Sequence, residues 1–228
     1  AQAVPVYEFD DLKLGRANAS CKECLPLQLV VGGLLRYLET RENDDELLAY
    51  FMPFTPGNCR FPQYKVFINN LVEKHEIRNV TQFSLNAEKG YKVEAFGPAA
   101  RIAVLEALII SDVMEDIKNA IEVLAVDLEQ GRAVFETQWR RIIELFERWE
   151  INHLDATLKD VARECAKIPL KRPLSEAKKV AVMGEVFVRR DWFSSAELME
   201  RFVANDIVVK KAHFFEWLKY VDELVRRG

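Results

Sequence analysis

Between residues 47 and 86, short apolar runs flank one amphipathic stretch, and this alternation restricts the fold more than any other feature. The run LLAYFMPF (47–54) has the length and the bounding turn residues of a buried strand, and NVTQFSLN (79–86) is typical of the next strand. Between them, PQYKVFINNLVEKHEI (62–77) has the periodicity of a helix. Strand, helix and strand in this order predict a βαβ unit, whose two strands lie parallel.

The rest of the chain repeats this organisation around a long helical stretch. Apolar residues recur every three or four positions over 98–166, which predicts three or four helices, and a linker with two prolines follows at 168–177. After the linker we expect a strand, a helix capped by Ser194 or Ser195, a second strand and a closing helix, over residues 178–188, 194–206, 207–211 and 212–227.

The expected fold class is therefore α/β, with Rossmann-like βαβ units, parallel strands and a largely helical middle segment. We expect an α/β part carrying the cysteine motifs at 1–97, a helical segment at 98–172 and a second α/β part at 173–228. In parallel sheets of this kind, ligands bind beyond the carboxyl ends of the strands.

Two cysteines, Cys21 and Cys24, lie three residues apart at the start of a helix predicted over 24–40. Pro26 suits the first turn of that helix, where a missing N–H costs nothing. The unpaired amides and the positive dipole end of the helix favour thiolates beside them. The pair alone fits a metal clamp, a redox couple or two buried structural thiols.

A third cysteine, Cys59, favours the metal interpretation because it lies in a loop bounded by Pro and Gly, between a predicted strand and a predicted helix. Three thiols from a helix start and such a loop suit a cubane iron–sulfur cluster whose fourth iron is open or is completed by another protein. Zinc is the main rival and would need a fourth ligand. Cys165 has helical spacing in its segment, so we expect it in the core or on a helix surface.

Three charged residues are further candidates for binding a cofactor. Arg60, next to Cys59, could hold an anion or a sulfide, or could pair with a surface acid. Arg189 directly follows the strand predicted over 178–188, at the edge where ligands bind, although a solvated strand end is an equally good interpretation. Glu185 would lie inside that apolar strand, where an unpaired carboxylate is costly to bury.

Composition excludes several classes of partner. The chain has 32 Lys and Arg against 36 Asp and Glu, a net charge of −4, which argues against a nucleic-acid or membrane-surface partner. Its apolar runs are too short and interrupted to span a bilayer, and we find neither a charged leader nor a phosphate-binding glycine loop. With four cysteines and no export signal, we expect reduced thiols and a cytoplasmic location.

Three segments in this order resemble the large CoA-substrate-specific enzyme activases, relatives of 2-hydroxyacyl-CoA dehydratase and its activator. They are SCKECLPLQLVVGGLLRYLE, FMPFTPGNCRFPQY and VAVMGEVFVRRDWFS, the last followed by EWLKYVDE. The resemblance implies a dehydratase-like part built of Rossmann-like domains, with a cysteine-ligated [4Fe-4S] cluster that air can strip. It matches Cys21, Cys24 and Cys59 to the ligand cysteines of that family. It also implies an ATP-dependent activator as the electron donor, with an acyl-CoA as a candidate substrate.

One motif departs from the family pattern. The family usually has proline and glycine where this chain has Asn58 and Pro62. If that glycine lets the backbone approach a ligand, Pro62 restricts the approach, although proline suits the first position of a helix. We therefore expect an iron–sulfur domain that receives electrons in a dehydratase- or reductase-like reaction. The alternatives are an enzyme acting directly on an acyl-CoA and a non-catalytic scaffold domain with zinc-bound or free cysteines.

Overall fold

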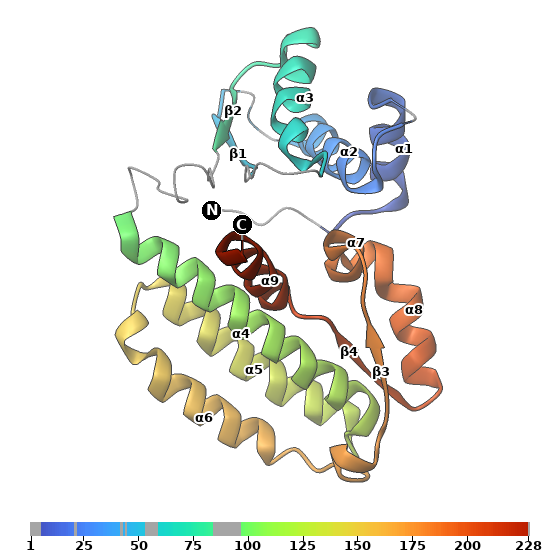
Figure 1. Cartoon of the computed structure of the whole chain (residues 1–228), viewed down its shortest axis with the longest axis vertical. Coiled ribbons are helices and arrows are strands. Elements are labelled where there is room, and N and C mark those ends of the chain that lie inside the picture. The colour runs from blue at the N-terminus through green and yellow to red at the C-terminus, as the bar shows by residue number, and fades with distance from the viewer. Residues whose placement is uncertain are drawn as a thin grey trace. The chain divides into compact units, whose positions relative to one another are not determined.

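The computed structural model divides the chain into two compact units, Ala1–Arg101 and Ile102–Gly228. It describes residues 6–20, 22–41, 43, 45–52, 59–83 and 97–227. Within these ranges the chain is mostly helical and carries two small parallel sheets, as Figure 1 shows. None of the described helices combines the length and the apolar character that crossing a membrane requires.

The first unit contains the βαβ arrangement predicted from the sequence. Its elements in chain order are α1 (Phe9–Asn18), α2 (Leu25–Thr40), β1 (Leu48–Phe51), α3 (Phe61–Lys74) and β2 (Val80–Phe83). Strands β1 and β2 pair in parallel, with Leu48 opposite Val80 and Phe51 opposite Phe83. The parallel pairing confirms the crossover that the intervening helix predicted.

Helices α1 and α2 pack at very short range because glycines remove the side chains between them. A Cβ placed on Gly15 would lie 1.7 Å from the carbonyl oxygen of Gln28, and one on Gly32 would lie 1.8 Å from that of Asp11. The Asp11 side chain is fully buried and forms an ion pair with Arg36, with 2.7 Å between its Oδ1 and Nε. Close backbone packing and an ion pair to a buried carboxylate thus join the two helices.

The second unit begins with three long helices that share one core. Figure 1 shows α4 (Gly97–Leu124), α5 (Leu128–Glu147) and α6 (Leu154–Ala166) side by side. Their facing sides contribute a cluster of buried apolar residues, among them Met114, Phe135, Ile142 and Val161. A short 3₁₀ turn, η2 (Ile151–His153), joins α5 to α6. This confirms the helical segment expected over 98–166.

The remaining elements of the second unit form a small α/β arrangement against α4. In chain order they are η3 (Leu174–Glu176), β3 (Lys178–Val182), α7 (Val186–Arg190), α8 (Trp192–Ala204), β4 (Ile207–Lys211) and α9 (Phe214–Arg227). Strands β3 and β4 pair in parallel, with Lys178 opposite Ile207. Leu124 at the end of α4 is buried with Ala177 and Val208, so the helical segment and the second α/β part share a core.

The structure corrects the expected strand over 178–188. Strand β3 ends at Val182, and Gly184 has a φ of +125°, a conformation that residues with a Cβ rarely adopt. The chain then forms the short helix α7, with Glu185 as its N-cap rather than as a strand residue. Helix α8 also begins earlier than predicted, because the Asp191 side chain caps it in place of Ser194 or Ser195.

Candidate functional site

Cys24 lies at the N-terminal end of α2. It is the N-cap residue of this 16-residue helix, and its carbonyl accepts a hydrogen bond from the Gln28 amide at 3.3 Å. The side chain is half-buried, and its Sγ lies 2.6 Å from the Tyr64 hydroxyl oxygen in α3. The sequence placed Cys24 at a helix start correctly but did not reveal its contact with Tyr64.

Cys59 lies just before the N-terminal end of α3. Arg60 is the N-cap residue of that helix, and Phe61 is its first residue. The Phe61 amide donates a hydrogen bond to Cys59 Sγ at 3.4 Å, and the Cys59 side chain is exposed. Amides at a helix N-terminus carry partial positive charge, so Cys24 and Cys59 each lie beside the positive end of a helix dipole.

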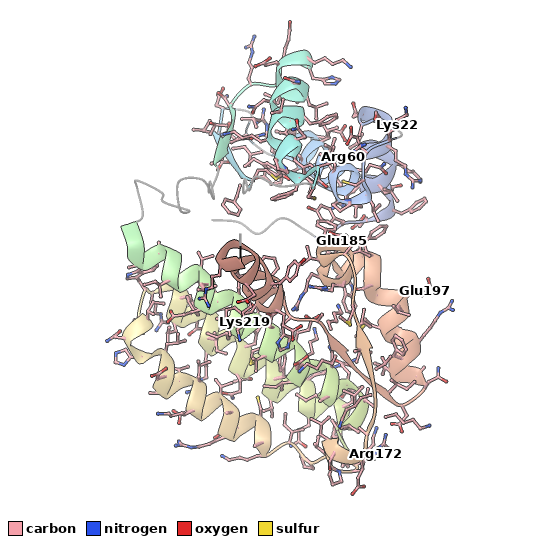
Figure 2. All side chains as sticks on the ribbon, viewed as in Figure 1. Lys22, Arg60, Arg172, Glu185, Glu197 and Lys219 are labelled. Carbon is pink, nitrogen blue, oxygen red and sulfur yellow. The ribbon has the colours of Figure 1, made fainter. Side chains whose placement is uncertain are left out.

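Two bridges bring the segments of Cys24 and Cys59 together. Arg60 Nη1 donates a hydrogen bond to the Lys22 carbonyl at 2.9 Å and lies 3.8 Å from a Glu23 carboxylate oxygen. Figure 2 shows Lys22 and Arg60 on neighbouring parts of this unit.

The second bridge is aromatic. The Phe61 ring, next to the Cys59 segment, packs edge-on against the ring of Tyr64, with 5.3 Å between centroids. Tyr64 in turn contacts Cys24. Segments 35 residues apart in sequence therefore meet at the N-terminal ends of two adjacent helices.

The third predicted ligand, Cys21, lies outside the described residues. Among the residues that the structure describes, no group of three or more histidine, cysteine, aspartate or glutamate side chains is placed to hold a metal ion. The convergence of three sulfurs therefore stays a prediction, while the shared location of the Cys24 and Cys59 segments is a structural finding.

Cys165 belongs to the second unit. It lies on α6 and packs against the apolar core of α4, α5 and α6. Burial raises the pKa of its thiol, and the neighbouring Glu164 carboxylate adds to the rise. Both effects favour the neutral thiol, which is the state of a structural cysteine rather than of a metal ligand.

Glu185 and Arg189 also belong to the second unit, where their observed contacts are local. The Glu185 carboxylate accepts a hydrogen bond from the Val188 amide at 2.7 Å and so caps α7. Arg189 Nη1 donates to the Gly184 carbonyl at 2.7 Å. The structure thus places both side chains around one turn, whereas it places Arg60 with the cysteines.

Sequence reasoning missed a charged network at the carboxyl ends of β3 and β4. Arg190 bonds both Asp112 and Glu115 on α4, and Lys211 at the end of β4 lies 2.9 Å from Glu115. Burial lowers the pKa of Arg190, because desolvation disfavours its charged form. The signal was present in the apolar stretch IISDVMED, whose acids are spaced three and four residues apart and so share one helix face.

Asp112 gives this network a structural role. Its carboxylate is buried and accepts hydrogen bonds from the amides of Phe214 and Phe215, each at 3.1 Å, at the start of α9. A helix N-terminus at the carboxyl edge of a parallel sheet is where an anionic ligand would bind. In this chain the Asp112 carboxylate occupies the N-terminus of α9, where such a ligand would bind.

A pocket of about 540 Å³ lies at the opposite end of α2 from Cys24. Its lining includes Leu35 and Leu38 of α2, together with residues of the turn between α3 and β2, such as Ile77. Because a helix rises 1.5 Å per residue, Leu38 is roughly 20 Å along α2 from Cys24. The pocket and the cysteine segments are therefore separate features of the first unit.

Comparison of the chain with protein-family models, with curated proteins and with solved structures finds no match. The site geometry and the sequence motifs therefore carry the functional proposal.

Proposed function

We propose that the first unit holds a [4Fe-4S] cluster on Cys21, Cys24 and Cys59. The observation that supports it best is the pair of bridges from Arg60 to Lys22 and from Tyr64 to Cys24. These contacts bring together two sequence-distant cysteine segments at two helix N-termini, as a shared metal site requires.

The thiols of Cys24 and Cys59 fit the donor set of such a cluster. Both belong to residues at helix N-terminal ends, and the Arg60 guanidinium reaches from the Cys59 segment to the Lys22 carbonyl in the Cys24 segment. A cluster with net negative charge is stabilised by these surroundings. When bound, the group would supply one-electron transfer, and three cysteines would leave one iron open to a further ligand.

The wider role follows from the resemblance to CoA-substrate-specific enzyme activases. We propose that the chain is a dehydratase-like part of such a system, with Rossmann-like βαβ units, and that an ATP-dependent activator delivers its electrons. An acyl-CoA is the candidate substrate that the resemblance offers. Because Glu185 and Arg189 make local bonds around α7, the proposal assigns them no contact with the substrate.

One observation favours a second candidate, a scaffold domain with zinc-bound or free cysteines. The Cys24 sulfur already has a hydrogen-bonding partner in Tyr64 and so is satisfied without a metal. A free thiol in that position would be a small, half-buried group of ordinary character.

Metal content distinguishes the two candidates. We expect the chain, purified and reconstituted without oxygen, to be brown, to absorb broadly in the visible range and to contain roughly four iron and four sulfide per chain. The iron should be lost on exposure to air. A colourless chain that binds zinc, or that binds no metal under these conditions, would instead support the scaffold.

A further inference from the structure

Tyr64 is a buried polar residue whose hydroxyl contacts a proposed ligand. Its side chain lies in the first turns of α3 and is 4% exposed. The hydroxyl oxygen is 2.6 Å from Cys24 Sγ, and either atom can act as the donor when the sulfur carries a proton. The Phe61 ring packs edge-on against Tyr64 and helps to fix its orientation.

The direction of this hydrogen bond is settled when Cys24 binds a metal. A ligating cysteine is a thiolate and has no proton to give. The Tyr64 hydroxyl, which has one proton, must then donate and the sulfur must accept. We propose that Tyr64 is a positioning residue that acts through Cys24, holding its sulfur toward the cluster and lowering the electron density on it. This inference rests on the proposed function.

The consequence is a defined effect on the reduction potential. Reduction by one electron adds negative charge to the cluster and its ligand sulfurs. A donor hydrogen bond to one sulfur stabilises that added charge, so it makes reduction easier. The effect is strengthened because Tyr64 is buried, where hydrogen bonds are less screened by water.

The test compares Tyr64→Phe with the wild type, both reconstituted without oxygen and titrated with dithionite while visible absorption is followed. Phenylalanine keeps the ring and its packing but removes the donor. We expect unchanged iron per chain and a midpoint potential shifted to a more negative value. Tyr220→Phe, which removes the same atom from a side chain 61% exposed on α9, is the matched control and should leave the potential unchanged.

Each outcome decides one claim. Equal potentials in Tyr64→Phe and the wild type, with equal iron, overturn the role of Tyr64 and leave the cluster in place. A wild type that takes up no iron overturns the cluster itself, and this inference with it. If Tyr64→Phe folds poorly, replacement of Tyr64 by a fluorinated tyrosine keeps the donor and strengthens it. That variant should shift the potential to a more positive value, and no shift would overturn the role of Tyr64.

Discussion

Cys59→Ser is expected to lose nearly all iron after anaerobic reconstitution while the chain stays folded. The side chain is exposed, so its thiol contributes little packing, and serine preserves its size. A neutral hydroxyl is a far weaker ligand for iron than a thiolate, so the site would keep only two of its three proposed ligands. The measurement is iron per chain, together with circular dichroism to verify the fold.

Cys165→Ser is the matched control for this loss. It changes the same atom on a residue of α6 that packs against the helical core of the second unit. Iron content should equal that of the wild type, and the free energy of unfolding should fall by ~1–3 kcal/mol if the hydroxyl is left without a partner. Equal iron in Cys59→Ser and the wild type would remove Cys59 from the site. Loss of iron in Cys165→Ser would make the site a four-cysteine one.

Gly32→Ala is expected to destabilise the first unit strongly. The added methyl group would lie 1.8 Å from the Asp11 carbonyl oxygen, a backbone atom that can move only if α1 moves as a whole. Overpacking of this kind costs about 3 kcal/mol or more, well above the ~1 kcal/mol that alanine gains over glycine in a helix. Denaturant unfolding, followed by far-UV circular dichroism, measures the loss.

Gly33→Ala is the comparison for this change. It adds the same methyl group at the next position of α2, but there the nearest atom, at 2.7 Å, belongs to the Tyr7 ring. A side chain can rotate away more easily than a backbone, so we expect a net change within about 1 kcal/mol. Equal destabilisation by the two substitutions would contradict the close contact between α1 and α2.

The elements predicted best were those in which apolar residues recur at a regular spacing along the sequence. Helix α2 and the β1–α3–β2 unit follow it closely, and so do α4 to α6. Helix α1 escaped prediction because its buried face consists of Asp11, Leu12 and Gly15, of which only the leucine counts as apolar in a pattern. Its burial depends on a glycine contact and an ion pair with α2, which no local pattern shows.

The error at α7 has a different cause. The segment EVFVRR is rich in β-branched and aromatic residues and continues an apolar run, so its local preference is for a strand. In the structure, the backbone at Gly184 turns the chain and the Glu185 side chain caps the short helix that follows. Asp191 then caps α8 directly behind it, so that two capping carboxylates override the strand preference.

The candidate site was predictable in its residue types but not in its contacts. Spacing and loop position were enough to single out Cys24, Cys59 and Arg60. The partner of Cys24 is 40 residues away in the sequence, and its identity depends on how α2 and α3 pack. Asp112 and Glu115 were visible in the sequence as charges in an apolar helix. Their partner, Arg190, is 75 or more residues away, so no local pattern connects it to them.

The central claim is that the cysteines before α2 and α3 form one site, and a short thiol crosslinker tests it without depending on bound iron. The reduced, metal-free chain is treated with dibromobimane, which joins two thiols only when they lie close together, and linked peptides are identified by mass spectrometry. The account predicts a link from Cys59 to Cys24 or Cys21. Links between Cys21 and Cys24 alone, with Cys59 modified singly, would contradict it.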